Sequence, residues 1–113
     1  MIRVEVQRNP GGEITTLRVK GHAGYGVRGQ DIVCAGVSAL TQSALLGLQR
    51  FLAGDVQLEL AEGLLQVVLP ERLSPEERNN ASVILETVML GIEHIALNYP
   101  RNIRIVDRVK KKN

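Results

Sequence analysis

The sequence predicts an α+β fold in the order ββαββαβ, a mostly antiparallel mixed sheet packed with two long helices. Short segments in which apolar and polar residues alternate predict the strands, and two longer segments with apolar residues at steps of three and four predict the helices. A chain of 113 residues with 44% hydrophobic content has the size of one ordinary domain. We therefore expect residues 1–113 to form a single domain.

Five short segments alternate in the way that strands do. Residues 2–8 place Ile2, Val4 and Val6 two positions apart, and a turn over 9–12 leads into the next segment. The predicted strands span residues 2–8, 14–20, 56–60, 64–69 and 103–106. The first two and the next two have the pattern of hairpins, which predicts antiparallel pairs and a sheet with one covered face.

Two segments have helical periodicity. The first spans residues 31–53 with Asp31 as a suitable N-cap, and the second runs from Pro75 to about residue 98 behind a capping box of Ser74 and Glu77. The stripes predicted to face the core are Val33, Val37, Leu40, Ala44, Leu48 and Phe51 on the first helix, and Val83, Ile84, Val88, Gly91, Ile92 and Ile95 on the second. The first helix also carries apolar residues off its stripe, at Ile32, Ala35, Ala39, Leu45 and Leu52. It therefore either sits centrally in the core or packs in part on a second subunit.

The composition narrows the function classes. Net charge is +2 with both signs mixed along the chain, so no long basic stripe marks a nucleic-acid site, and 3% aromatic content leaves few rings to stack on bases. The first residues lack the apolar core of a secretory signal, and no stretch reaches about 18 uninterrupted apolar residues, so we expect a soluble, cytoplasmic protein. One cysteine cannot form an internal disulfide, and with two histidines it cannot supply a thiolate-rich zinc site. We expect neither a metal nor a cofactor.

The informative pair is His22 and Cys34, twelve positions apart. A thiol is only a few per cent ionised at neutral pH, so a nucleophilic cysteine needs a group that stabilises its thiolate. If Asp31 caps the helix, Cys34 lies in the first turn, where unpaired N–H groups and the positive end of the dipole favour an anion and offer donors for an oxyanion. His22 can accept the thiol proton because a glycine-rich loop over residues 21–30 lets it fold back. The pattern therefore favours nucleophilic catalysis.

Neighbouring residues leave alternatives open. Asp31 either caps the helix or orients His22 as a third member of the site. Ser38, one turn after Cys34, either reaches the site or bonds back to the carbonyl of Cys34. The loop glycines Gly24, Gly26 and Gly29 fit no phosphate-binding motif, so a lid that clamps a peptide is the better interpretation. Tyr25 in this loop is either a substrate contact or a packing anchor, and His94 is interpreted as structural or solvent-facing.

The runs Gly21-His22-Ala23-Gly24-Tyr25-Gly26, Gly29-Gln30-Asp31-Ile32-Val33-Cys34-Ala35 and Val37-Ser38-Ala39-Leu40 resemble the signature of the ribosomal-processing cysteine protease family, Prp. The resemblance implies proteolytic removal of the N-terminal extension of a large-subunit ribosomal protein after a hydrophobic, Phe-Phe type motif. It implies that Cys34 and His22 are catalytic, that Gly21, Asp31 and Ser38 support them, and that the protein is a homodimer. The lid interpretation, which rests on the glycines themselves, makes Ala23, Gly24, Tyr25, Gly26 and Gly29 the expected substrate loop. One departure is Gly36, where the family pattern leads us to expect alanine.

Two other functions remain compatible with the residues. In one, the chain is a non-catalytic ribosome-assembly module that binds RNA through the loop and the lysines of residues 110–112, with Cys34 as a core residue. In the other, Cys34 is a redox-sensing thiol that pairs with a thiol of a second chain. A membrane partner and an obligatory nucleic acid are not expected.

Overall fold

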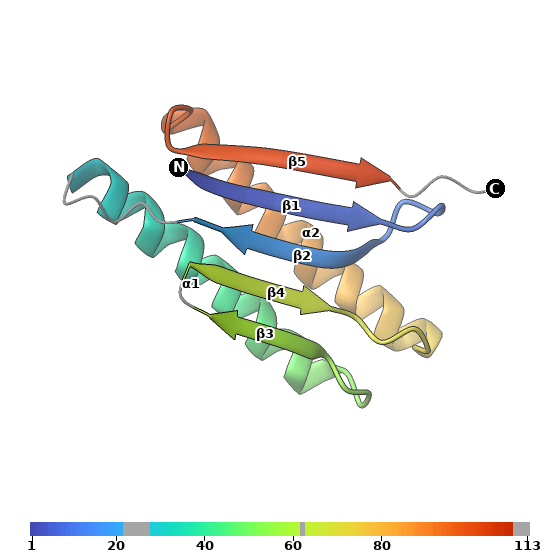
Figure 1. Ribbon diagram of the computed structural model, residues 1–113. Helices are drawn as coiled ribbons and strands as arrows, with labels where there is room; N and C mark the ends of the chain where they lie inside the picture. The colour runs from blue at the N-terminus through green and yellow to red at the C-terminus, as the bar shows by residue number, and fades with distance from the viewer. Residues whose placement is uncertain (22–27, 62, 110–113) are drawn as a thin grey trace.

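The computed structural model describes residues 1–21, 28–61 and 63–109, and for residues 28–31 it describes the backbone path only. The elements are β1 (Ile2–Arg8), β2 (Ile14–Lys20), α1 (Arg28–Phe51), β3 (Gln57–Ala61), β4 (Leu64–Val68), α2 (Pro75–Asn98) and β5 (Ile103–Val109). The strands form one sheet in the order β3-β4-β2-β1-β5 (Figure 1). The predicted α+β class and the order ββαββαβ are confirmed.

The sheet is mixed because its last strand returns beside its first. β1 pairs with β2 and β4 pairs with β2 and β3 in antiparallel fashion, whereas β5 runs parallel to β1. Both helices lie behind the sheet in Figure 1, so one face is covered and the other is open. A parallel neighbour needs a crossover, and α2 provides it between β4 and β5. The turn chemistry predicted the hairpins, but it could not predict this parallel pair.

The core lies between the covered face of the sheet and the two helices. Alternate residues of β1, namely Ile2, Val4 and Val6, are buried, and so are Leu17 of β2 and Val67 of β4. The buried residues of β1, β2 and β4 lie side by side through the cross-strand pairs Val6↔Leu17 and Leu17↔Val67.

The last residue of β1, Arg8, joins the sheet to α2. It forms ion pairs with Asp107 of β5 and with Glu86 of α2. Its hydrogen bond to Asp107 raises the pKa of Arg8 further above its usual range.

The start of α2 follows the predicted capping box. The backbone N–H of Glu77 donates to the hydroxyl of Ser74 at 3.1 Å, and the N–H of Ser74 donates to the Glu77 carboxylate at 3.0 Å. The same carboxylate accepts the N–H of Ala53 at 2.7 Å, which ties the end of α1 to the start of α2. The hydrogen bond from the backbone of Ser74, followed by that from Ala53, lowers the pKa of Glu77. This contribution to stability is present above the ordinary glutamate pKa and is lost as the pH falls through the lowered value.

The start of α1 differs from the prediction. The helix begins at Arg28, so Asp31 lies inside its first turn and is not the N-cap, and Gly29 and Gln30 belong to the helix and not to the loop. Arginine and glutamine are good helix formers, and an acidic residue is favoured anywhere in a first turn, so Asp31 alone did not locate the boundary. Of the predicted loop, residues 21–30, only Gly21 is therefore described as lying outside the helix.

The helix stripes were predicted in part. Phe51 and Val83 were expected in the core but are 57% and 58% exposed, whereas Leu45 and Leu52 are buried. Phe51, the last residue of α1, lies on the exposed side while its neighbour Leu52 is buried. On α2 the buried residues include Leu85 and Met89 and not Val83. Ile32–Phe51 and Pro75–Asn98 are long and apolar enough to span a membrane by composition alone, yet each buries a stripe of side chains against the sheet, as core helices do.

Small residues let the helices approach each other. A Cβ added at Gly36 would lie 3.2 Å from Cδ1 of Ile95, and one at Gly91 would lie 3.0 Å from Cδ1 of Leu40. The glycine at position 36, the departure from the family pattern, therefore faces α2 and not the cavity described below. An alanine there would require only a small shift of the end of one isoleucine side chain.

Candidate active site

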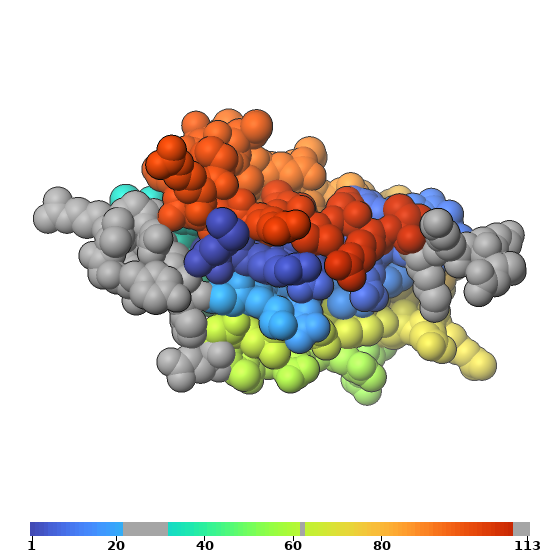
Figure 2. All heavy atoms as spheres, turned by 45° about the horizontal axis from the view of Figure 1, so that its top comes forward, coloured from blue at the N-terminus to red at the C-terminus, as the bar shows by residue number. Residues whose placement is uncertain are grey.

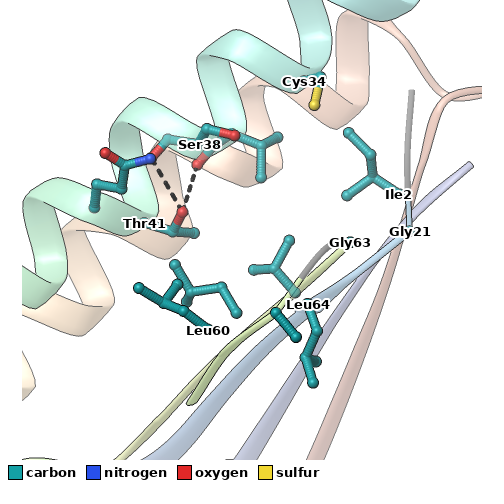
Figure 3. A pocket seen from close by; sticks show the side chains of 13 residues that line it. Ile2, Gly21, Cys34, Ser38, Thr41, Leu60, Gly63 and Leu64 are labelled. Atoms are coloured by element: carbon teal, nitrogen blue, oxygen red, sulfur yellow. Dashed lines mark hydrogen bonds between the residues drawn. The ribbon is translucent and has the colours of Figure 1, made fainter. Parts of the chain in front are cut away.

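A cavity of about 220 Å³ opens between α1 and the end of the sheet at which β1 begins and β2 ends. The helix contributes Cys34, Val37, Ser38, Thr41 and Gln42. The strands and their ends contribute Ile2, Val19, Gly21, Leu60, Ala61, Gly63, Leu64 and Leu65. Figure 3 shows the sulfur of Cys34 directed from the helix toward the space beside Ile2 and Gly21. One wall is thus polar and reactive, and the other is mainly apolar.

Cys34 is half-buried, a free thiol that packs partly on the core and lines the cavity. A purely structural cysteine would be enclosed, so this position fits a thiol that a substrate can reach. It is the seventh residue of α1, however, and not a member of the first turn. Unpaired N–H groups and the dipole act only within about one turn of a helix start. The prediction that Cys34 lies in the first turn, where the helix terminus helps to stabilise the thiolate and offers donors for an oxyanion, is therefore wrong. Of the two devices considered for stabilising the thiolate, the base remains.

Gly21 has a conformation that requires glycine. Its φ is +98°, and a Cβ at this position would overlap the backbone carbonyl of Met1. Its N–H donates to the carbonyl of Gly63 at 2.9 Å, which joins the end of β2 to the turn before β4. Because Gly21 directly precedes His22, this close packing sets where the chain leaves the sheet. Its role in supporting the catalytic pair stays a prediction.

Three polar residues follow Cys34 along one side of α1. Ser38, Thr41 and Gln42 stand four, seven and eight positions later and line the cavity with it. The Thr41 hydroxyl donates to the carbonyl of Val37 at 2.9 Å and lies 3.1 Å from that of Ser38. Among the described residues Ser38 makes no bond to the carbonyl of Cys34, so the back-bonding alternative is wrong and its hydroxyl remains available to the cavity. The helical spacing of these residues could have identified Thr41 and Gln42 in advance.

Several predicted site residues cannot be placed. His22, Ala23, Gly24, Tyr25 and Gly26 lie outside the described residues. Asp31 and Gly29 are placed by backbone only, three and five positions before Cys34 on α1. His94 of α2 is exposed and does not line the cavity. No group of three or more His, Cys, Asp or Glu side chains that could hold a metal gathers within the described ranges.

An α+β domain whose half-buried cysteine lines an open cavity belongs to the class of candidate thiol hydrolases. Comparison with known proteins gives the specific family: the model of the family described as cysteine protease Prp matches residues 1–104. The chain belongs to this family of cysteine proteases.

Known relatives align with this chain over nearly its full length. A ribosomal processing cysteine protease Prp of Bacillus subtilis is 30% identical over 111 residues, covering 96% of this chain and 99% of the relative. The crystal structure of an essential ribosomal processing protease Prp from S. aureus with a substrate peptide is similar, with a TM-score of 0.80 at 27% identity over 95% of this chain and 99% of that one. The structure of the S. aureus protease with a covalently linked product peptide matches over the same shares, with a TM-score of 0.78 at 28% identity.

Proposed function

We propose that this cysteine protease removes the N-terminal extension of a large-subunit ribosomal protein in the cytoplasm, with Cys34 as nucleophile and His22 as base. The position of Cys34 carries the proposal: it is the only cysteine of the chain and it faces a cavity. A cysteine protease with one thiol has one candidate nucleophile. The linked product peptide of the S. aureus relative supports a mechanism that passes through a covalent intermediate.

His22 directly follows Gly21, which lines the same cavity as Cys34, and this adjacency in the sequence supports His22 as the proposed base. In the proposed reaction His22 takes the thiol proton, and the sulfur attacks the peptide carbonyl. The C–N bond breaks as the imidazolium gives its proton to the leaving amine, and a thioester remains. Water, deprotonated by the same histidine, then hydrolyses the thioester and restores the thiol.

Asp31 and Ser38 are proposed to support this pair. Since Asp31 is not the N-cap, orientation of His22 is the role that remains of the two considered. Ser38 lies one helical turn after Cys34 with its hydroxyl free for the cavity, where it can donate to a bound peptide. Ala23, Gly24, Tyr25 and Gly26 are proposed to close over the substrate.

The wall opposite Cys34 favours an apolar substrate. Ile2, Leu60 and Leu65 supply aliphatic surface on that wall. On the helix side, the hydroxyl of the buried Thr41 is bonded to its own helix. A hydrophobic side chain gains free energy by leaving water for such a wall. This agrees with a cut after a Phe-Phe type motif, and the names of the relatives supply the ribosomal context.

A peptide that copies such an extension should be cut once, after its hydrophobic motif. Replacing both aromatic residues of the peptide with serine should lower kcat/KM by about 1,000-fold, because each buried aromatic side chain contributes roughly 2 kcal/mol of apolar contact. Mass spectrometry of the products gives the cut site. Cleavage of the serine peptide at the same rate, or cuts scattered along either peptide, would refute the proposed substrate class.

The homodimer is also a proposal, and the outer side of α1 supports it. Ile32 and Leu46 are 61% and 66% exposed on this helix, with Ala35 and Ala39 exposed between them. Exposed aliphatic side chains at helical spacing are typical of an interface.

The double variant Ile32→Glu/Leu46→Glu should be a monomer of 12.4 kDa by light scattering, whereas the wild type should have twice that mass. The matched control is Val83→Glu/Leu90→Glu, which places the same charges on exposed residues of α2. A monomeric wild type, or a dimer that only the α2 variant dissociates, would contradict this interface.

A further inference from the structure

The open face of the sheet collects positive charge that is dispersed in the sequence. Cross-strand pairs place Lys20 of β2 and Arg104 of β5 on either side of Arg3 of β1. Two and four positions further along the strands, Arg18 and Arg108 point to the same face, because every second residue does. We call these five residues, Arg3, Arg18, Lys20, Arg104 and Arg108, the basic face. Figure 2 shows β1 in blue, β2 in light blue and β5 in red-orange side by side on the near surface.

Few acidic groups offset this charge. The strand residues of the open face include only two carboxylates, those of Glu5 and Glu59. Glu5 lies 3.2 Å from Arg3, and within the described part of the chain Arg18, Lys20, Arg104 and Arg108 have no ion-pair partner. Asp107 points to the covered face, where it pairs with Arg8. The whole chain carries only +2, so this face is much more positive than the molecule as a whole.

The neighbouring like charges of the basic face are unfavourable for the sheet by itself. Neighbouring strands lie about 4.8 Å apart, and like charges directly opposite each other are destabilising. The row of Lys20, Arg3 and Arg104 sets three cations side by side with no acidic residue between them. Like charges on neighbouring strands are expected where a bound ligand supplies compensating negative charge.

We propose that the basic face binds the phosphate backbone of RNA while the cavity on the covered side cuts a peptide. The row of three cations stands at the cavity end of the sheet: Arg3 follows the cavity residue Ile2, and Lys20 precedes Gly21. A polyanion on the open face would therefore lie close to a peptide entering the cavity. The choice of RNA among polyanions rests on the proposed ribosomal substrate, since such a protein assembles on RNA.

The residues of the face set the mode of binding. Its strands contain no aromatic side chain, so base stacking is absent and the contact is to phosphates without sequence preference. The apolar strand residues Leu64, Val68 and Val106 on this face are only partly exposed, whereas membrane-surface proteins combine cations with projecting apolar side chains. The chemistry fits RNA better than an anionic bilayer.

The test is fluorescence anisotropy with a labelled RNA hairpin over a series of salt concentrations. Wild type should bind with log K falling linearly in log salt, and Arg104→Gln/Arg108→Gln should bind about tenfold more weakly with a slope smaller by about 2. Both residues are exposed on an edge strand, so the variant should unfold at the wild-type temperature. The control Arg50→Gln/Arg72→Gln removes the same charge from exposed positions off the sheet and should bind RNA like the wild type.

Three results would overturn the proposal. They are absence of RNA binding by the wild type, equal weakening in both double variants, and tighter binding to vesicles of equal parts phosphatidylcholine and phosphatidylserine than to RNA. If the arginines only protect the β5 edge from pairing with other chains, the first variant would aggregate while its monomer kept full RNA affinity. Peptide cleavage is measured separately, so a failure here leaves the protease assignment intact.

Discussion

Replacing Cys34 with alanine abolishes peptide cleavage, lowering kcat/KM by roughly 10⁴-fold or more, as removal of a nucleophile does in other proteases. His22→Ala gives a loss of similar size, because α1 begins too far upstream for its terminus to ionise the thiol unaided. The double variant is no worse than either single variant, since the two groups act as one unit. Initial rates on the peptide with the hydrophobic motif measure all three.

The matched control is Ser43→Ala, an exposed position on the same helix that does not line the cavity. It should keep wild-type activity, and circular dichroism should show that all variants are folded. Substantial cleavage by Cys34→Ala would mean that another group is the nucleophile. Full activity in His22→Ala, with loss only in Cys34→Ala, would leave the nucleophile but remove the proposed base.

Gly21→Ala should be the most damaging single-methyl change in the described chain. It forces a non-glycine residue to φ near +98° and drives its Cβ into the carbonyl of Met1, so the start of β1 and the end of β2 must separate. We expect a loss of about 3 kcal/mol or more in the free energy of unfolding, measured by urea denaturation. The kcat/KM of the folded variant should also fall, because the proposed base His22 directly follows Gly21 in the chain.

Gly12→Ala separates the two causes of this loss. Gly12 also has a positive φ, +87°, but no atom lies within 4 Å of the added Cβ. It should lose only the conformational part, about 1–2 kcal/mol, and keep its activity. Equal losses of stability in the two variants would show that the contact with Met1 contributes nothing.

The sequence predicted the elements whose signals are local. The capping box of Ser74 and Glu77 located the start of α2, and alternation in Ile2, Val4 and Val6 located β1. The start of α1 was missed by three residues because both Arg28 and Asp31 suit a first turn. Helical periodicity also predicted Val83 in the core, and this was wrong. Periodicity identifies an apolar stripe on a helix, but it does not show which residues at the margin of the stripe contact the sheet.

Non-local pairing explains what could not be predicted at the site. Cys34 was identified by its motif, but the opposite wall depends on strand order, which brings Ile2 and Leu60 together from distant parts of the chain. The basic face was missed for the same reason. Arg3, Lys20 and Arg104 are isolated charges in the sequence and become neighbours only through the register of three strands.

The central claim is that Cys34 is acylated by the peptide during turnover. Intact-protein mass spectrometry of the enzyme, quenched in acid during steady-state cleavage, tests it most directly. The account predicts a species heavier by the N-terminal product less one water, with the adduct mapped to Cys34 and absent from Cys34→Ala. Cleavage that proceeds with an adduct on a different residue, or a Cys34→Ala enzyme that still acquires the adduct, would contradict it.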